Sequence, residues 1–260
     1  MTLVVRDSVT MLGRQLRHMR RDLSTSLILL AVPIIFLLLF VYVLGGTLGD
    51  GLDDGDGGRA AYVDYVVPGI LLITVASAVQ GTAIGVAMDM TEGIVARFRT
   101  MAIARSSVLT GHVLGSLLMI LFQLTVVLAV ALLIGFRPNA TAIEWLAAGG
   151  LLTATAFALI WLAVGMGLAA KTVAGASNMP MPLTLLPLFG SGFVPTESMP
   201  TALRLFAEHQ PFTPIMETLR GLLMGTGVGV SGWVAGGWCT AITLAGYAWA
   251  KRNYDRDRTR

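Results

Sequence analysis

The chain has 260 residues, of which 55% are hydrophobic and only 13% are charged. Soluble domains carry about 25% charged residues, so a water-soluble globule of this size is excluded. The net charge of +3 does not indicate a nucleic-acid partner, and the single Cys239 excludes an intrachain disulfide and a thiolate metal cluster. Long uncharged stretches instead predict an all-α polytopic membrane protein with one transmembrane domain over residues 1–260.

The amino-terminal segment, residues 1–26, predicts an amphipathic helix on the inner membrane surface. Apolar residues recur at alternating spacings of four and three from Val5 to Leu23, while most arginines fall elsewhere around the helix. Burial of the apolar face and attraction of arginine to anionic headgroups would hold this helix at the membrane. The alternative is that these arginines act only as a topology signal.

Six stretches are long and apolar enough to cross a hydrocarbon core of about 30 Å. They cover residues 27–45, 66–87, 111–135, 143–168, 172–192 and 228–250. The fifth stretch contains Asn178 and several prolines, so it cannot form one straight helix. Two pairs of small residues, Gly81 with Gly85 and Gly232 with Gly236, favour close helix contacts.

The distribution of basic residues predicts the orientation in the membrane. If the amino terminus is inside, fourteen of the eighteen Lys and Arg residues lie in inner segments and four in outer segments. This bias predicts an even number of spans and both termini in the cytoplasm. The loop between the first two spans is rich in Gly and Asp, which predicts a flexible external segment.

The inner connection at residues 88–110 predicts a partner-binding surface. It combines arginines with apolar residues, so a short helix would present Phe98 as an anchor, surrounded by guanidinium groups that could bind carboxylates. The alternative is that the arginines only enforce topology, and composition does not decide between the two.

The outer connection at residues 193–227 predicts two short amphipathic helices. Pro200 begins the first helix and Pro211 ends it, and Thr213 caps the second helix with Pro214 in its first turn. We expect them to dip into the outer leaflet as a re-entrant pair or to lie in its headgroup plane. The functional interpretation is a lid over an outer exit, and the alternative is a packing wedge between the last two spans.

Two parts of the sequence resemble those of type-2 ABC exporter permeases, in particular the daunorubicin-resistance branch. Their order along the chain and their predicted inner and outer locations also match that family. The run RFRTMAIAR at residues 97–105, preceded by Glu92 and Gly93, is similar to the cytoplasmic coupling segment of that family. The runs FVP at 193–195, MP at 199–200 and HQPFTP at 209–214 are similar to its outer element. Ala102 stands where the family commonly has Pro, which puts only the local geometry of the helix end in doubt.

The resemblance implies a permease subunit of an exporter of lipophilic drugs, antibiotics or lipids in the bacterial cytoplasmic membrane. It implies pairing with a second copy or a homologous permease, and two separate cytoplasmic ATPase subunits that bind ATP and Mg²⁺. The implied coupling contacts are Glu92, Gly93, Arg97, Phe98, Arg99, Ile103 and Arg105. The implied outer gate consists of Phe193, Pro195, Met199, Pro200, Pro211 and Thr213.

The residues themselves predict no catalytic or metal-binding site, so any energy must come from another chain. The run GMGLAAKT at residues 165–172 has Ala170 where a phosphate loop needs Gly, and it follows a membrane helix instead of a strand. No charged residue lies at the centre of a predicted span, which argues against a proton-coupled pump. The polar residues that could line a substrate path through the membrane are Gln80, Gln123, Asn178 and Thr184. Such residues also commonly hydrogen-bond between helices.

Two other classes of protein are alternatives. A membrane scaffold would insert stably without an ATPase partner. An intramembrane serine hydrolase is suggested by the Gly-Ser-Gly run at residues 190–192, but its serine would need a base within hydrogen-bond reach. The three histidines, His18, His112 and His209, lie in the amino-terminal helix, at the inner edge of the third span and in the outer helical pair.

Overall fold

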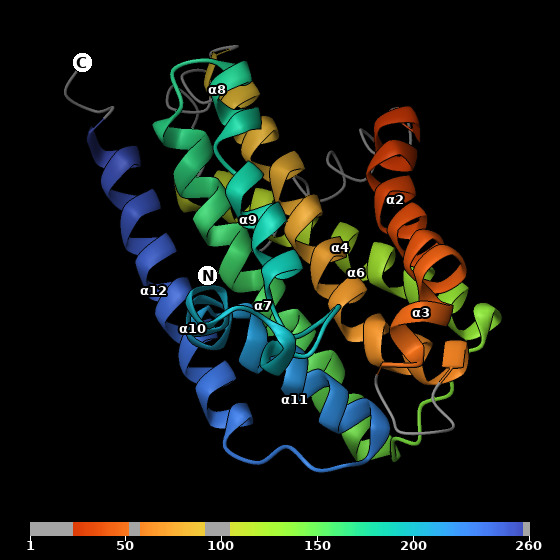
Figure 1. Ribbon diagram of the computed structural model, residues 1–260. Helices are drawn as coiled ribbons and strands as arrows, with labels where there is room; N and C mark the ends of the chain where they lie inside the picture. The colour runs from red at the N-terminus through yellow and green to blue at the C-terminus, as the bar shows by residue number, and fades with distance from the viewer. Residues whose placement is uncertain (1–22, 52–57, 92–104, 257–260) are drawn as a thin grey trace.

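The computed structural model describes residues 23–51, 58–91 and 105–256, and within these ranges every regular element is a helix (Figure 1). Four helical stretches are long and apolar enough to cross a membrane. They are Leu30–Gly49, Gly58–Thr91, Gly111–Ile134 and Ala142–Ala169. These stretches coincide with the first four predicted spans and confirm a helical membrane protein. Most of the predicted amino-terminal helix and the coupling segment lie outside the described residues.

The first span changes its helical pitch along its length. It comprises α2 (Leu23–Leu38), the π-helical η1 (Leu39–Leu44) and the short α3 (Gly45–Gly49). A π-helical turn adds a residue to the turn and rotates the side chains that follow it. Phe40, in η1, is one of the side chains in this turn, and it reaches the outer element described below.

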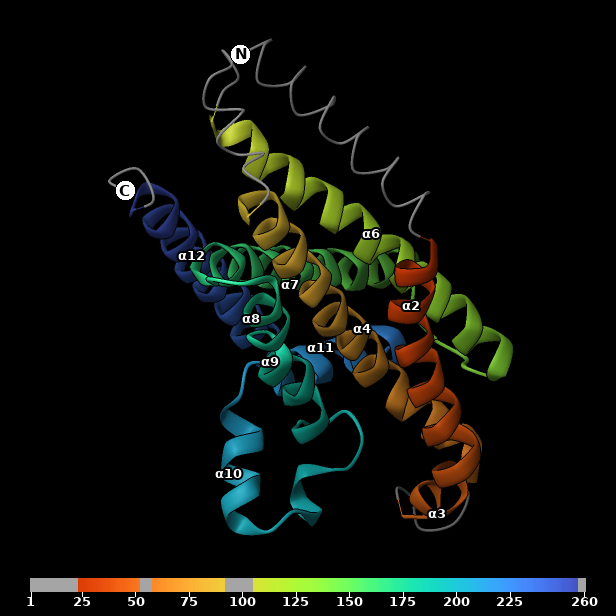
Figure 2. The same ribbon diagram turned by 90° about the horizontal axis from the view of Figure 1, so that it is seen from above.

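The central helix is α4 (Gly58–Thr91), which packs against α2, α6 (Arg105–Ile134) and α7 (Ala142–Ala169). All residues from 66 to 79 are buried. Their sequence, VVPGILLITVASAV, is apolar or small on every face, as expected for a helix surrounded by other helices. Figures 1 and 2 show α4 between α2 on one side and α7 on the other.

The carboxyl-terminal helix α12 (Ser231–Arg256) packs along α7, on the side away from α2 (Figure 1). A Cβ added to Gly246 would lie 2.7 Å from the backbone N of Leu162, so the two backbones touch at this crossing. The rings of Trp161 and Tyr247 meet edge to face beside it, with centroids 5.0 Å apart. The start of α7 is fixed by a capping box in which Thr141 and Glu144 bond to each other's backbone N–H groups.

The predicted fifth span is broken, as its prolines indicated. It forms α8 (Val173–Asn178), α9 (Met181–Leu185) and the 3₁₀ turn η2 (Leu186–Phe189). The predicted sixth span corresponds to α12, which is 26 residues long but is not one of the four helical stretches found long and apolar enough to cross a membrane. The count of six spans therefore stays a prediction.

The outer connection folds into η3 (Thr196–Ser198), α10 (Thr201–His209) and α11 (Phe212–Met224). Pro200 occupies the N-cap position of α10, as predicted. The predicted cap of the second helix is wrong, because Pro211 already occupies the N-cap position of α11 and the helix begins at Phe212. The Thr213 hydroxyl instead donates to the Ala207 carbonyl and closes the corner between α10 and α11.

One glycine of each predicted small-residue pair lies away from any helix contact. No atom lies within 4 Å of a Cβ added to Gly85 or Gly236, so neither glycine is needed for a helix contact. A Cβ added to Gly167, in contrast, would lie 2.7 Å from the Ala83 carbonyl oxygen. The spacing of small residues identifies a narrow helix face but not whether another helix covers it.

Candidate functional site

The predicted coupling residues Glu92, Gly93, Arg97, Phe98, Arg99 and Ile103 lie outside the described residues, and Arg105 is the first residue of α6. The structure does describe the two helices that flank this segment. The ring Nε2 of His112 lies 2.8 Å from Asp89 Oδ2, and both side chains are largely buried. This polar contact joins α4 and α6 near the ends from which the segment leaves. The sequence placed His112 at the inner edge of its span but gave it no partner.

Two of the four predicted substrate-path residues join α4 to the broken segment. The Gln80 amide donates to the Ser177 carbonyl at 2.9 Å and to its hydroxyl at 3.2 Å. The Thr184 hydroxyl lies 3.4 Å from the Ala76 carbonyl oxygen. Because Ala76 and Gln80 are one turn apart on α4, these contacts lie on one face of that helix.

The other two predicted path residues lie apart from this contact. Asn178 is exposed at the end of α8. Gln123 is buried in α6, and its amide nitrogen has no hydrogen-bond partner among the described residues. The structure therefore brings together Gln80 and Thr184 of the predicted set.

Phe193, in the predicted outer gate, joins the outer element to two spans. Its ring centroid lies 4.6 Å from that of Phe40 in the first span. Its carbonyl accepts a hydrogen bond of 3.2 Å from the Tyr62 hydroxyl of α4. Phe193 is buried, so its ring adds apolar contact to this junction.

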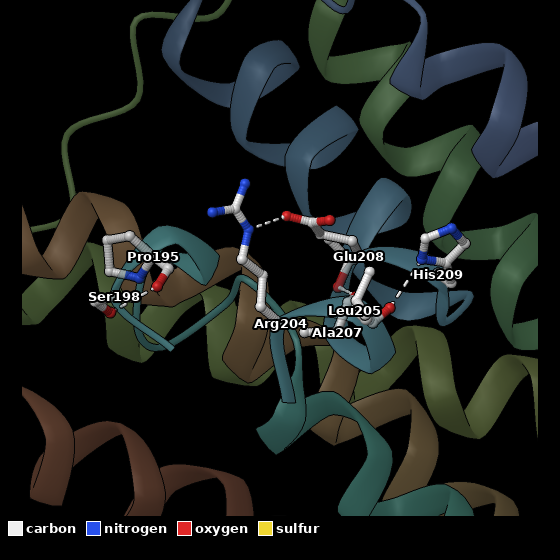
Figure 3. A network of polar contacts seen from close by, with 8 residues as sticks. Pro195, Ser198, Arg204, Leu205, Ala207, Glu208 and His209 are labelled. Carbon is white, nitrogen blue, oxygen red and sulfur yellow. Dashed lines mark hydrogen bonds and ion pairs between the residues drawn. The ribbon is translucent and has the colours of Figure 1, made fainter. Parts of the chain in front are cut away.

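The prolines of the predicted gate shape the outer element. The Pro195 carbonyl accepts hydrogen bonds from the Ser198 hydroxyl at 2.7 Å and from its backbone N–H at 3.2 Å (Figure 3). Pro200 and Pro211 lie at the starts of α10 and α11, and Met199 lies partly buried between η3 and α10. These residues form the corners of the outer element.

Helix α10 presents apolar side chains at the surface. Leu205 and Phe206 are 56% and 48% exposed. On its polar side, Arg204 and Glu208 form an ion pair of 2.6 Å, and this carboxylate raises the pKa of Arg204 above its ordinary value (Figure 3). An exposed amphipathic helix of this kind is typical of a membrane interface.

Arg220 is a partly buried cation that the sequence did not single out. Its Nη2 donates to the Ser191 carbonyl at 2.7 Å and to the Tyr65 carbonyl at 3.2 Å. The Tyr65 hydroxyl donates to the same Ser191 carbonyl at 2.8 Å. Arg220 thereby joins α11, α4 and the end of the broken segment. In the sequence, Arg220 could have been noticed as an arginine close to the apolar Leu219 and Leu222 of a predicted short amphipathic helix.

Ser191 has none of the surroundings of a nucleophile. Its Oγ has no hydrogen-bond partner among the residues that the structure describes. His112 contacts Asp89, and the ring Nδ1 of His209 contacts the Leu205 carbonyl. Neither histidine activates this serine, so the described structure does not support the hydrolase alternative.

Comparison with known proteins identifies the family. The family profile described as ABC-2 type transporter matches residues 7–224, a range that includes the predicted coupling segment and the outer connection through α11. The chain belongs to this family. This ABC-2 permease is 27% identical over 214 residues to the daunorubicin resistance ABC transporter permease protein DrrB1 of Streptomyces coeruleorubidus. That match covers 82% of this chain and 70% of the relative.

A second relative of this ABC-2 permease is the probable doxorubicin resistance ABC transporter permease protein DrrC of Mycobacterium tuberculosis, strain CDC 1551. The two chains are 26% identical over 245 residues, which cover 90% of this chain and 84% of the relative. Both matches confirm the resemblance to the daunorubicin-resistance branch.

Proposed function

We propose that this protein is the membrane subunit of an ABC exporter that moves lipophilic drugs, antibiotics or lipids across the bacterial cytoplasmic membrane. The match to the ABC-2 type transporter family over residues 7–224 carries the proposal. The relatives named for daunorubicin and doxorubicin resistance support a largely apolar cargo with polar groups. Uncharged span centres are consistent with such a cargo, because an ionisable relay is not needed when ATP supplies the energy.

Energy would come from two cytoplasmic ATPase subunits that bind ATP and Mg²⁺ and contact the segment at residues 92–105. A permease dimer, formed with a second copy or a homologous chain, would receive them. The contact between Asp89 and His112 supports this role, because it joins the two helices that the segment connects. A force on the segment would then move α4 and α6 together.

The outer element would act as the lid of the exit. Its support is the set of contacts that Phe193 and Arg220 make with Tyr62 and Tyr65 of α4. The proposed substrate path runs along the contact of α4 with α8 and α9. Gln80 and Thr184 hold that contact closed in this conformation, and Gln123 and Asn178 remain the other polar positions proposed for the path.

The test reconstitutes the protein with its ATPase in liposomes and measures daunorubicin-stimulated ATP hydrolysis. The double variant Phe98→Ala with Arg99→Ala should insert normally and lose at least about tenfold of the stimulation, because it removes an aromatic anchor and its neighbouring cation. The matched control is Lys171→Ala, which removes an exposed basic residue that follows α7. This control should behave as the unchanged protein does.

Two results would overturn the proposal. One is full stimulation of the double variant, which would remove the coupling role of residues 92–105. The other is stable insertion of the protein with no associated ATPase and no drug transport, which would favour a membrane scaffold.

A further inference from the structure

The first span changes its pitch where it meets the outer element. Residues Leu39–Leu44 form the π-helical η1, and their sequence, LFVYVL, contains no proline that would force this pitch. A π-helical turn holds one residue more than an α-helical turn, and such turns inside α-helices are frequent at functional sites. Phe40, in η1, packs on Phe193 with ring centroids 4.6 Å apart. The unusual pitch therefore coincides with a contact to the outer element.

The helix that follows η1 is fixed on α4. A Cβ added to Gly45 would lie 3.4 Å from Arg59 Cγ and 3.5 Å from Tyr62 Cδ1. A Cβ added to Gly49, at the end of α3, would overlap the backbone of Gly58. Because a rotation of α3 would bring residues with side chains to these positions, the start of α4 prevents it.

The helix that precedes η1 is held less firmly. The stretch Leu30–Gly49 is the least buried of the four apolar stretches. Among the side chains of α2 that the structure describes, only Pro33 and Leu37 are buried. Helix α2 carries no charged residue, so a turn about its axis exchanges one apolar face for another and brings no charge into the hydrocarbon core.

A change of η1 to α-helical pitch would therefore turn α2 and Phe40, while α3 stays in place. An α-helix turns about 100° per residue, so loss of the extra residue of the π turn rotates the preceding helix by about that angle. Phe40 is the second residue of η1 and would take most of this rotation. Its ring would then leave the ring of Phe193.

Phe193 is held from two sides. Its carbonyl accepts a hydrogen bond of 3.2 Å from the Tyr62 hydroxyl of α4, and its ring packs on Phe40 of the first span. Two residues earlier, the Ser191 carbonyl accepts from the Tyr65 hydroxyl of α4 at 2.8 Å. Polar contacts thus bind this backbone to α4, and one aromatic contact, which is weak enough to break and reform, binds it to the first span.

We propose that Phe40 is the latch of the outer element and that η1 is the hinge that engages and withdraws it. In the π-helical pitch, Phe40 packs on Phe193 and holds the start of the outer element. In the α-helical pitch, α2 is turned, Phe40 is withdrawn, and the outer element separates from the first span. That this separation opens an exit rests on the proposed export function, whereas the latch and the hinge do not.

The test measures how fast a maleimide reacts at position 191 of the Ser191→Cys variant, with the full chain in detergent and no ATPase. Ser191 is 4% exposed, and its hydroxyl has no hydrogen-bond partner within the described ranges, so the substitution should preserve the resting structure. The native Cys239 is buried beside Thr155 of α7. Its reaction in the same molecule reports any general loosening of the fold.

Addition of Phe40→Ala should raise the reaction rate at position 191 at least about threefold and leave the rate at Cys239 unchanged. Phe40→Leu, which keeps an apolar side chain in the contact, should give an intermediate rate. The matched control is Val43→Ala, which shortens a side chain of the same turn that is 69% exposed. An unchanged rate at position 191 in Phe40→Ala, or an equal acceleration at Cys239, would overturn the latch.

Deletion of Val43 tests the hinge. It removes the extra residue of the π turn, so a continuous α-helix would keep α2 and α3 in their present orientations with Phe40 engaged. This variant should unfold at a temperature no lower than that of the unchanged protein, and react at position 191 at least about threefold more slowly. A rate equal to or above that of the unchanged protein would overturn the hinge.

Export is measured separately, with the ATPase and daunorubicin in liposomes. Deletion of Val43 should abolish export, whereas Val43→Ala should not, because only the deletion prevents withdrawal of Phe40. Normal export by the deletion variant would overturn the role of the hinge in transport. If the unchanged protein itself exports nothing, the proposed function fails, and the reaction rates at position 191 still decide the latch and the hinge.

Discussion

The guanidinium carbon of Arg220 lies 3.8 Å from the centroid of the Tyr65 ring, so a charged side chain of the outer element packs on the central helix. The same guanidinium donates hydrogen bonds to two backbone carbonyls. One planar group therefore makes a cation–π contact and two charge-assisted hydrogen bonds, which an ammonium group cannot reproduce in the same geometry.

Arg220→Lys should lower the free energy of unfolding by about 2 kcal/mol, because hydrogen bonds from a charged group contribute about 1.5–3 kcal/mol. Thermal unfolding of the purified protein in detergent measures this change. Arg204→Lys is the control, since it alters an exposed pair and should leave the unfolding temperature unchanged. An equal decrease in both variants would contradict a special role of Arg220.

Gly246→Ala should destabilise the contact of α12 with α7. The added Cβ would lie 2.7 Å from the Leu162 backbone N and 2.9 Å from the Trp161 carbonyl carbon, so the helices must separate, at a cost of about 1–3 kcal/mol. Gly237→Ala, on the same helix, meets no atom within 4 Å and should be neutral or stabilising by up to about 1 kcal/mol. Thermal unfolding measures whether each variant is more or less stable than the unchanged protein. A more stable Gly246→Ala variant would refute the close contact between the backbones of α12 and α7.

His112→Phe should leave membrane insertion intact and reduce drug-stimulated ATP hydrolysis by about tenfold or more. It removes the ring nitrogen that contacts Asp89 and should therefore loosen α4 from α6 beside the predicted coupling segment. A loss of about 1.4 kcal/mol in coupling corresponds to a tenfold effect. Ser116→Ala, one turn further along α6, is the control. Unchanged stimulation in His112→Phe would show that this contact does not transmit the signal.

A cysteine at Thr201 should react with a membrane-impermeant maleimide added to intact cells. Thr201 is exposed at the start of α10, on the side predicted to be outside, and the native Cys239 is buried. Lys171→Cys, on the predicted inner side, should react only after the membrane is permeabilised. The reverse pattern would invert the predicted topology.

The first four spans could be predicted because crossing the membrane requires only a sufficiently long apolar stretch. The ends of the helices could not be predicted in this way. Helix α4, for example, extends from Gly58 to Thr91, whereas its apolar stretch covers residues 66–87. Hydropathy locates the part of a helix in the hydrocarbon core, while capping and contacts outside the core set the helix ends. The break in the fifth segment was predictable, because proline lacks a backbone N–H donor whatever the surrounding tertiary structure.

Most of the candidate site depends on contacts between distant parts of the sequence. Arg220 and Tyr65 are 155 residues apart, and only the fold reveals that they meet. Sequence patterns predicted the amphipathic helix that carries Arg220, and the resemblance pointed to Phe193, but neither indicated the partners of these residues on α4. The predicted cap at Thr213 failed for a local reason, because Pro211 in the same turn already starts the helix.

The length of helix α4 has a mechanical consequence. With 34 residues at about 1.5 Å each, it extends about 51 Å without interruption, from Thr91, which precedes the predicted coupling segment, to Gly58. A tilt of about 5° would displace one end by about 4 Å relative to the other, over a lever arm of this length. In the half of α4 that begins at Gly58, a Cβ added to Gly69 would lie 3.0 Å from the Gly192 carbonyl oxygen, so a tilt of this helix would directly displace the end of the broken segment.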